Sequence, residues 1–181
     1  EALGLDKAGV KLDPKGFVAV DDAGRSSNAI VFAIGDLAGP PLLAHKASAE
    51  GLVAVAAIAG RKSVKDFRAV PAAIFTSPEV ATVGLTEAQA KVEGRDIRIG
   101  KFPFIALGRA VSTNRTDGFV KLLADAKPDL VLGCQIVGPD ASTLIAEAAL
   151  AIEMGATAED LALTIHTHPT LPEALMEAAE A

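Results

Sequence analysis

The chain has 181 residues, enough for one domain or for one domain and part of a second. Half of the residues are hydrophobic and 22% are charged, so the composition favours a packed core over disorder. The net charge of −6 disfavours general binding to nucleic acid or to an acidic membrane surface, and no apolar run reaches the roughly 18–20 residues of a membrane span.

The first third of the chain has the pattern of an α/β layer. The continuous apolar run 30–34 predicts a buried parallel strand. A helix is expected from about Ala44 to Ala59, where Gly60 supplies a C-terminal cap. The charged stretch 61–68 then predicts a linker. We therefore expect residues 1–62 to be an incomplete α/β segment.

The pattern changes in the remainder, where strands come first and helices last. This order predicts an α+β domain over residues 68–181, with an antiparallel sheet and flanking helices. The expected strands are 72–76, 80–84, 97–102, 119–124 and 130–137. The expected helices are a short one that Thr86 and Gln89 cap, followed by 142–154, 158–163 and 171–180.

The expected helix 142–154 is apolar around most of its circumference, with only Glu147 and Glu153 charged. Such a helix is buried on more than one side. Two interpretations fit this pattern equally well: a central core helix, or a helix that packs against a second subunit.

Two further features of the sequence are its single cysteine and its first five residues. The single cysteine, Cys134, excludes a disulfide within the chain, and we expect it to be a small apolar strand residue in a reducing compartment. The first residues, from Glu1 to Leu5, show neither an initiator methionine nor a signal-peptide pattern. We therefore expect the chain to be a part of a longer protein.

The segment from His166 to Glu173 is the first candidate for chemistry. His168 could act as an acid or base near neutral pH, with Glu173 fixing its tautomer across the start of the last helix. A purely structural interpretation also fits, because Thr170 and Glu173 have the spacing of a capping box. Metal binding by His166 and His168 would need further ligands, and we predict no metal site.

The second candidate is the Gly35–Asp36 pair at the end of the apolar run, followed by the helix that begins at Ala44. Gly35 would let a ligand approach the backbone, and Asp36 could accept hydrogen bonds from sugar-like hydroxyls. The helix start offers unpaired N–H groups to a group that gains negative charge. Taken alone, the Gly-Asp pair is explained more simply by a plain turn.

In their order and spacing, these motifs resemble the C-terminal part of the pyridine nucleotide–disulfide oxidoreductase family. The resemblance covers essentially all 181 residues and is most specific over 33–51, 75–84 and 166–173. Its implied fold is an incomplete FAD-domain segment, 1–62, followed by an interface (dimerisation) domain, 68–181. The helix start at 43–47 and the additional His166 favour the branch of the family that oxidises dihydrolipoamide.

The resemblance also implies cofactors and residue roles. Asp36, after Gly35, would contact the ribityl chain of FAD, and backbone groups of Leu43, Ala44 and His45 would lie near the flavin ring. NAD would be the electron acceptor in the full-length enzyme.

By the same resemblance, His168 would be the catalytic base and Glu173 its orienting partner, serving the flavin of the opposite subunit of a homodimer. His166 would have a supporting role. The expected partner is the dihydrolipoyl acyltransferase subunit of a 2-oxoacid dehydrogenase complex. The expected location is the cytoplasm, with the mitochondrial matrix as the alternative.

Parts of the family pattern are absent from this sequence. It has no Gly-rich dinucleotide fingerprint and no pair of cysteines separated by four residues. We therefore expect the chain to be inactive alone and FAD binding by it to be weak. A glutathione-reductase-like enzyme and a non-catalytic dimerisation or docking module are the alternatives.

Overall fold

The structure, a computed structural model, describes residues 3–181, so the first two residues of the expected segment 1–62 lie outside the described part. The chain forms two compact units, the first ending at Asp66 and the second spanning Phe67–Ala181. Each unit has a hydrophobic cluster of its own.

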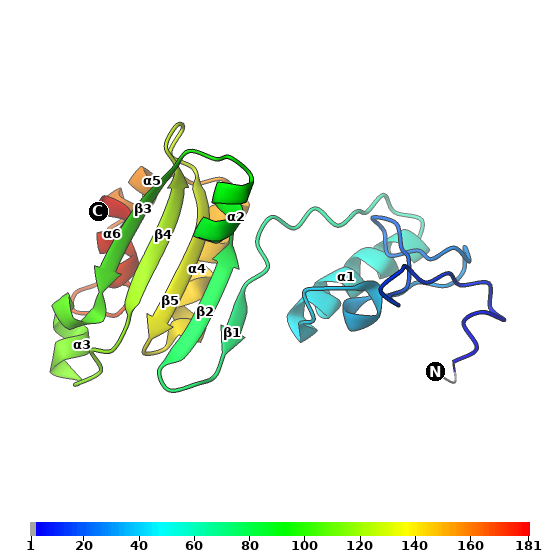
Figure 1. The fold of residues 1–181 in the computed structure, drawn as a ribbon, viewed down its shortest axis with the longest axis horizontal. Helices are drawn as coiled ribbons and strands as arrows, with labels where there is room; N and C mark the ends of the chain where they lie inside the picture. Colours follow the sequence, from blue (N-terminus) through cyan, green and yellow to red (C-terminus); the bar gives the residue numbers. More distant parts are fainter. Residues whose placement is uncertain (1–2) are drawn as a thin grey trace. The chain divides into compact units, whose positions relative to one another are not determined.

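The second unit is built on an antiparallel sheet of five strands, which confirms the predicted α+β class (Figure 1). Their spatial order is β1-β2-β5-β4-β3, so the last strand in the sequence lies at the centre. The strands are β1 (Ala72–Ile74), β2 (Glu79–Gly84), β3 (Ile97–Pro103), β4 (Phe119–Asp125) and β5 (Val131–Gly138). All five were expected within a few residues of these bounds.

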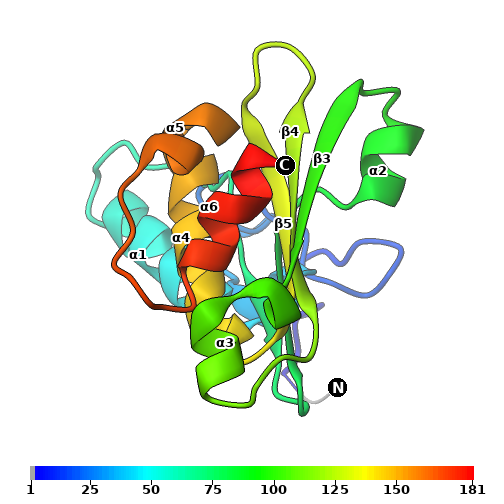
Figure 2. The ribbon, with the colours of Figure 1, turned by 90° about the vertical axis from the view of Figure 1, so that its left-hand side faces the viewer.

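Three helices cover one face of this sheet (Figure 2): α4 (Ala141–Met154), α5 (Ala158–Leu163) and α6 (Glu173–Glu180). Helix α4 packs on β2 and β5, and α6 packs on β3 and β4. The short helix α2 (Glu87–Val92) connects β2 to β3. Its predicted capping box is confirmed, because Thr86 Oγ1 accepts from Gln89 N and Thr86 N donates to the Gln89 side chain.

The interior of the second unit lies between the sheet and these helices. Fully buried side chains include Phe104, Leu122 and Ile136. Burying a side chain of this size contributes about 1.5–3 kcal/mol, so each of these residues stabilises the unit substantially. Helix α4 faces this core with its small and β-branched residues but leaves Leu150 and Met154 exposed. Within one chain, therefore, α4 is buried on one side only.

The segment between β3 and β4 contains two short elements that the sequence pattern did not predict. A 3-10 helix, η2 (Phe104–Ala106), leads into α3 (Gly108–Ser112). Phe104, Leu107 and Ala110 are buried, so their three-residue spacing is the signal that could have revealed this helical turn.

The first unit contains the predicted helix, α1 (Ala44–Ile58), and Gly60 follows it with a positive φ of 75°. A 3-10 helix, η1 (Gly35–Ala38), precedes it. The predicted strand 30–34 is wrong: Phe32 makes only an isolated bridge to Arg25, and Ile30 is 86% exposed. A strand of a parallel sheet needs neighbouring strands, and the described residues of this unit provide none.

Among the described residues, none of the helices combines the length and apolar character that crossing a membrane requires.

Candidate active site

His168 and Glu173 lie in direct contact at the start of α6. His168 Nδ1 is 2.8 Å from Glu173 Oε1. Because an ionised carboxylate only accepts hydrogen bonds, Nδ1 carries a proton, and in the neutral ring Nε2 is the nitrogen with the free lone pair. The His168 side chain is 78% exposed, whereas that of Glu173 is 13% exposed. The pair therefore consists of a fixed carboxylate and a ring whose basic nitrogen is open to an incoming group.

The Glu173 carboxylate is held from its other side by the backbone. Its Oε2 accepts a 2.7 Å hydrogen bond from Thr170 N. This bond first, and the His168 ring next, hold the pKa of Glu173 below its ordinary value. The carboxylate is thus kept ionised, as a partner for an imidazolium must be.

Only half of the expected capping box forms here. The Thr170 hydroxyl donates to Thr167 O at 2.7 Å instead of capping the helix. The last helix, expected from about residue 171, is present and begins two residues later, at Glu173. The turn before α6 is closed by a hydrogen bond from Ala174 N to Leu171 O, which has the i→i−3 spacing of a 3-10 helix. The α-helical hydrogen bonds therefore begin after this turn.

His166 is engaged by a residue that the sequence analysis did not assign, Glu147 on α4. His166 Nε2 is 2.8 Å from Glu147 Oε1, and Nδ1 is 2.8 Å from Thr164 O. The ring is 7% exposed. Burial lowers the pKa of His166, but the hydrogen bonds to Thr164 and Glu147 and the nearby carboxylates outweigh it, so this pKa is raised. The two residues are 19 positions apart, which left no pattern by which Glu147 could be recognised.

Cys134 lies within β5 and is fully buried, as expected of a structural residue. Burial, followed by the charge of Glu147, raises the pKa of its thiol to about 12. A thiol in this state is neither a nucleophile nor an available redox partner.

The predicted flavin-contacting residues lie on two segments of the first unit. Gly35 is buried and Asp36 is exposed in η1. Leu43 precedes α1 in an extended conformation, without a side-chain cap on the helix, and Ala44 and His45 are exposed. The first amides of α1 therefore have no side-chain cap from Leu43.

A buried ion pair ties these two segments together. Lys46 and Glu50 of α1 are 3.5 Å apart and nearly inaccessible. Glu50 Oε2 accepts from Gly35 N at 2.6 Å, and Lys46 Nζ donates to Gly39 O at 2.7 Å. Gly35 itself has a φ of 65°, and a β-carbon there would lie 2.7 Å from Ala47 Cβ. Glycine is thus required by packing against α1, a reason that sequence reasoning had not identified.

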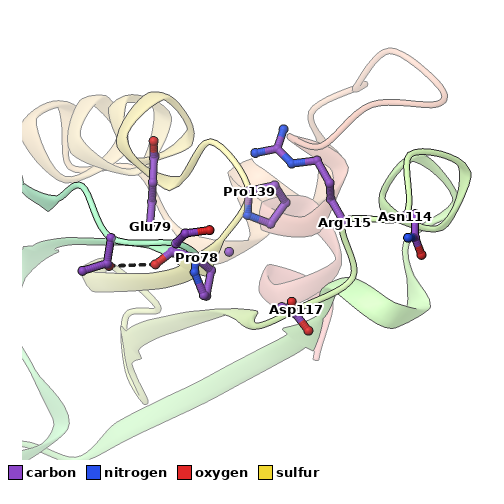
Figure 3. Close-up of a pocket in the computed structure, with 9 residues that line it drawn as sticks. Pro78, Glu79, Asn114, Arg115, Asp117 and Pro139 are labelled. Carbon is purple, nitrogen blue, oxygen red and sulfur yellow. Dashed lines mark hydrogen bonds between the residues drawn. The ribbon is translucent and has the colours of Figure 1, made fainter.

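A polar pocket lies at one end of the sheet (Figure 3). Neither His168 nor Glu173 lines it. Two of its charged residues, Glu79 and Arg115, are engaged in structural contacts. Glu79 accepts from Ser142 N at the start of α4, and Arg115 pairs with Asp140 at 2.9 Å. Within residues 3–181, no group of three or more His, Cys, Asp or Glu side chains is placed to hold a metal ion.

The sheet, its helical layer and the His–Glu pair define a domain class that comparison with known families identifies. Residues 70–179 match the family model described as pyridine nucleotide-disulphide oxidoreductase, dimerisation domain. Residues 1–51 match the model described as pyridine nucleotide-disulphide oxidoreductase. The chain belongs to the pyridine nucleotide–disulphide oxidoreductase family.

Individual relatives are more specific. The chain is 56% identical to dihydrolipoyl dehydrogenase of Thermus scotoductus, over 100% of the chain and 39% of that protein. It is also 56% identical to dihydrolipoyl dehydrogenase of Halobacterium salinarum, over 99% of the chain and 38% of that protein. The chain thus spans less than half of the length of these relatives.

Among solved structures, LpdA from Mycobacterium tuberculosis superposes with a TM-score of 0.91 at 31% identity, covering 99% of this chain and 39% of that one. The HOCl-induced flavoprotein disulfide reductase RclA from Escherichia coli superposes with a TM-score of 0.90 at 26% identity, covering 99% of this chain and 42% of that one.

Proposed function

We propose that the full-length protein is a dihydrolipoyl dehydrogenase, which oxidises protein-bound dihydrolipoamide and reduces NAD+. In this proposal the present chain supplies the general base, His168, its partner Glu173 and the dimer interface. The observation that carries it is the 2.8 Å contact between His168 Nδ1 and Glu173 Oε1, combined with an exposed ring. The names of the relatives support the choice of substrate.

The chemistry of the pair follows from its geometry. His168 Nε2 takes the proton from a dihydrolipoamide thiol, and the resulting thiolate is the nucleophile that attacks a redox disulfide. Glu173 stabilises the imidazolium and holds the ring in the tautomer that accepts at Nε2. In the net reaction, dihydrolipoamide loses two electrons and two protons, NAD+ gains a hydride, and one proton is released.

The redox disulfide must come from elsewhere in the full-length protein. This chain contains one cysteine, and that residue is buried in β5. We therefore expect the chain to show no dihydrolipoamide oxidation by itself.

The residues of the first unit fit part of an FAD site. An exposed carboxylate at Asp36 suits sugar-like hydroxyls, and the amides at Leu43, Ala44 and His45 suit an acceptor edge of a ring. When bound, FAD carries electrons between the disulfide and NAD. The Lys46–Glu50 pair would hold both segments in place for this contact.

A homodimer completes the proposal. Helix α4 exposes Leu150 and Met154. Ile165, which lies close to His168 in the sequence, is 97% exposed. Exposed apolar residues of this size favour a protein interface, and the matched family model is a dimerisation domain. The dihydrolipoyl acyltransferase subunit of a 2-oxoacid dehydrogenase complex is the proposed partner, in the cytoplasm.

The test uses the full-length enzyme with FAD bound. Wild type should reduce NAD+ with dihydrolipoamide and should not act on glutathione disulfide. His168→Ala should lower the dihydrolipoamide reaction by about 10²–10⁴-fold, while reduction of an artificial dye by NADH should change much less. An equal loss of both activities would contradict the base assignment. Tight acyltransferase binding without either activity would favour a docking module.

A further inference from the structure

The segment from Leu163 to Pro169, which carries His168, has few attachments to the rest of the domain. It contains no helix or strand after α5, and all of its residues except His166 are exposed. Apart from the His168–Glu173 contact, the hydrogen bonds described between Ile165 and Pro169 are those of the His166 ring and one from Thr170 to Thr167. His166 is therefore the residue by which this segment is anchored.

The anchor requires a charged ring. One nitrogen of His166 meets a carbonyl oxygen, that of Thr164, and the other meets the Glu147 carboxylate, each at 2.8 Å. Both partners accept hydrogen bonds, and a neutral imidazole has only one N–H to donate. The arrangement is therefore satisfied when His166 is an imidazolium paired with an ionised Glu147.

The charge on His166 also reaches the His168–Glu173 pair. The ionisable groups near the ring are Glu147 from α4 and Glu173 from α6, with His168 in the same segment. Both carboxylates favour the charged ring and raise the pKa of His166, while the charge of His166 helps to lower the pKa of Glu173. Glu147, His166, Glu173 and His168 thus form a row in which acidic and basic groups alternate.

We propose that the ion pair between Glu147 and the His166 imidazolium is a positioning device, which seats the segment 164–168 on α4 and keeps His168 against Glu173. Neither residue touches the reacting atoms in this proposal. Their effect passes through the placement of His168, and the inference rests on the proposed function of His168 as the base. Loss of the His166 proton releases the segment and misplaces the base, and loss of the Glu147 charge makes that proton easier to lose.

The decisive variant is Glu147→Gln in the full-length FAD-bound enzyme, because glutamine keeps the shape and an acceptor oxygen but removes the charge. Dihydrolipoamide oxidation should fall by about 10- to 100-fold, the cost of a misplaced catalytic group. NADH-dependent dye reduction, which does not use the base, should stay at the wild-type rate. Glu153→Gln is the matched control: it removes one charge from the same helix, where Glu153 accepts from Arg68 N and Ala69 N.

The pH profile separates positioning by charge from a structural role. At a pH low enough for both enzymes to carry the imidazolium, the deficit should be small. The activity deficit of Glu147→Gln should be largest in the pH range where His166 has lost its proton in the variant but still holds it in wild type. Glu147→Asp, which retains the charge, should keep the wild-type profile at a lower rate. It also provides the measurement if Glu147→Gln does not retain FAD.

Each outcome decides the inference. A deficit confined to that pH window supports it. A deficit equal at every pH, an equal loss of dye reduction, or full activity of Glu147→Gln overturns it. If wild type does not oxidise dihydrolipoamide, or if His168→Ala does not affect that reaction, the proposed function fails instead.

Discussion

Glu173 contacts His168 through one carboxylate oxygen and the Thr170 amide through the other, at 2.8 Å and 2.7 Å. The same side chain thus orients a candidate base and closes the turn before α6. This double attachment explains why the pKa of Glu173 lies below its ordinary value of 4.5, with the Thr170 amide as the larger cause.

Glu173→Gln should therefore reduce the melting temperature of the chain in a pH-dependent way. A lowered folded-state pKa means that the stabilisation is fully present above the unfolded value and is lost as pH falls through the folded value. Melting curves of wild type and variant should differ most above about pH 5 and converge in more acidic buffer. A difference that persists unchanged at acidic pH would show that the carboxylate's charge is not responsible.

The α+β unit was predictable because its signals are local. Alternation, turn residues and the Thr86–Gln89 capping box each identify an element from a few neighbouring residues. The run 30–34 failed for the opposite reason, since a strand depends on a partner that the run itself does not encode. The helix at 108–112 was missed because its five residues are too few to show a helical period.

The contacts of the candidate site likewise fall into two groups: those that local sequence spacing suggests and those that only the packing of distant segments reveals. The contact between His168 and Glu173 spans five residues, so its spacing could suggest it. The contact between His166 and Glu147 joins α4 to the segment after α5, and only the packing of the two reveals it. Lys46 and Glu50 have the i,i+4 spacing of a surface ion pair, but their burial depends on the turn that folds over them.

Gly35→Ala should destabilise the chain more than Gly60→Ala. Both positions have positive φ, which costs an L-residue roughly 1–2 kcal/mol. At Gly35 the new methyl would also lie 2.7 Å from Ala47 Cβ, whereas nothing lies within 4 Å at Gly60. This overpacking should add about 1–3 kcal/mol to the loss of unfolding free energy. Denaturant titrations of both variants measure the difference, and equal midpoints would contradict the close approach.

Lys46→Met should destabilise the chain by about 3–5 kcal/mol, because it leaves Glu50 buried without its nearest cation. Lys65 is 3.9 Å from Glu50 and offsets only part of this loss. Lys62→Met, at an exposed position of the same unit, should have almost no effect.

The double variant Lys46→Met/Glu50→Leu should recover only part of the lost stability, because Gly35 N then loses its acceptor. Denaturant midpoints of the four proteins test this, and a Lys46→Met value equal to that of Lys62→Met would rule out a buried pair.

Cys134 should resist thiol reagents in the folded chain and react once when the chain is unfolded. With a pKa of about 12 caused mainly by burial, the thiolate fraction at pH 8 is on the order of 10⁻⁴, and the sulfur is also inaccessible. A matched control places the chain's one cysteine at an exposed site: Val92, on α2, is 88% exposed, so Cys134→Ala/Val92→Cys should react in the native state. Mass spectrometry after timed labelling distinguishes the two. Rapid native labelling of Cys134 would contradict its burial and would mean that β5 opens readily.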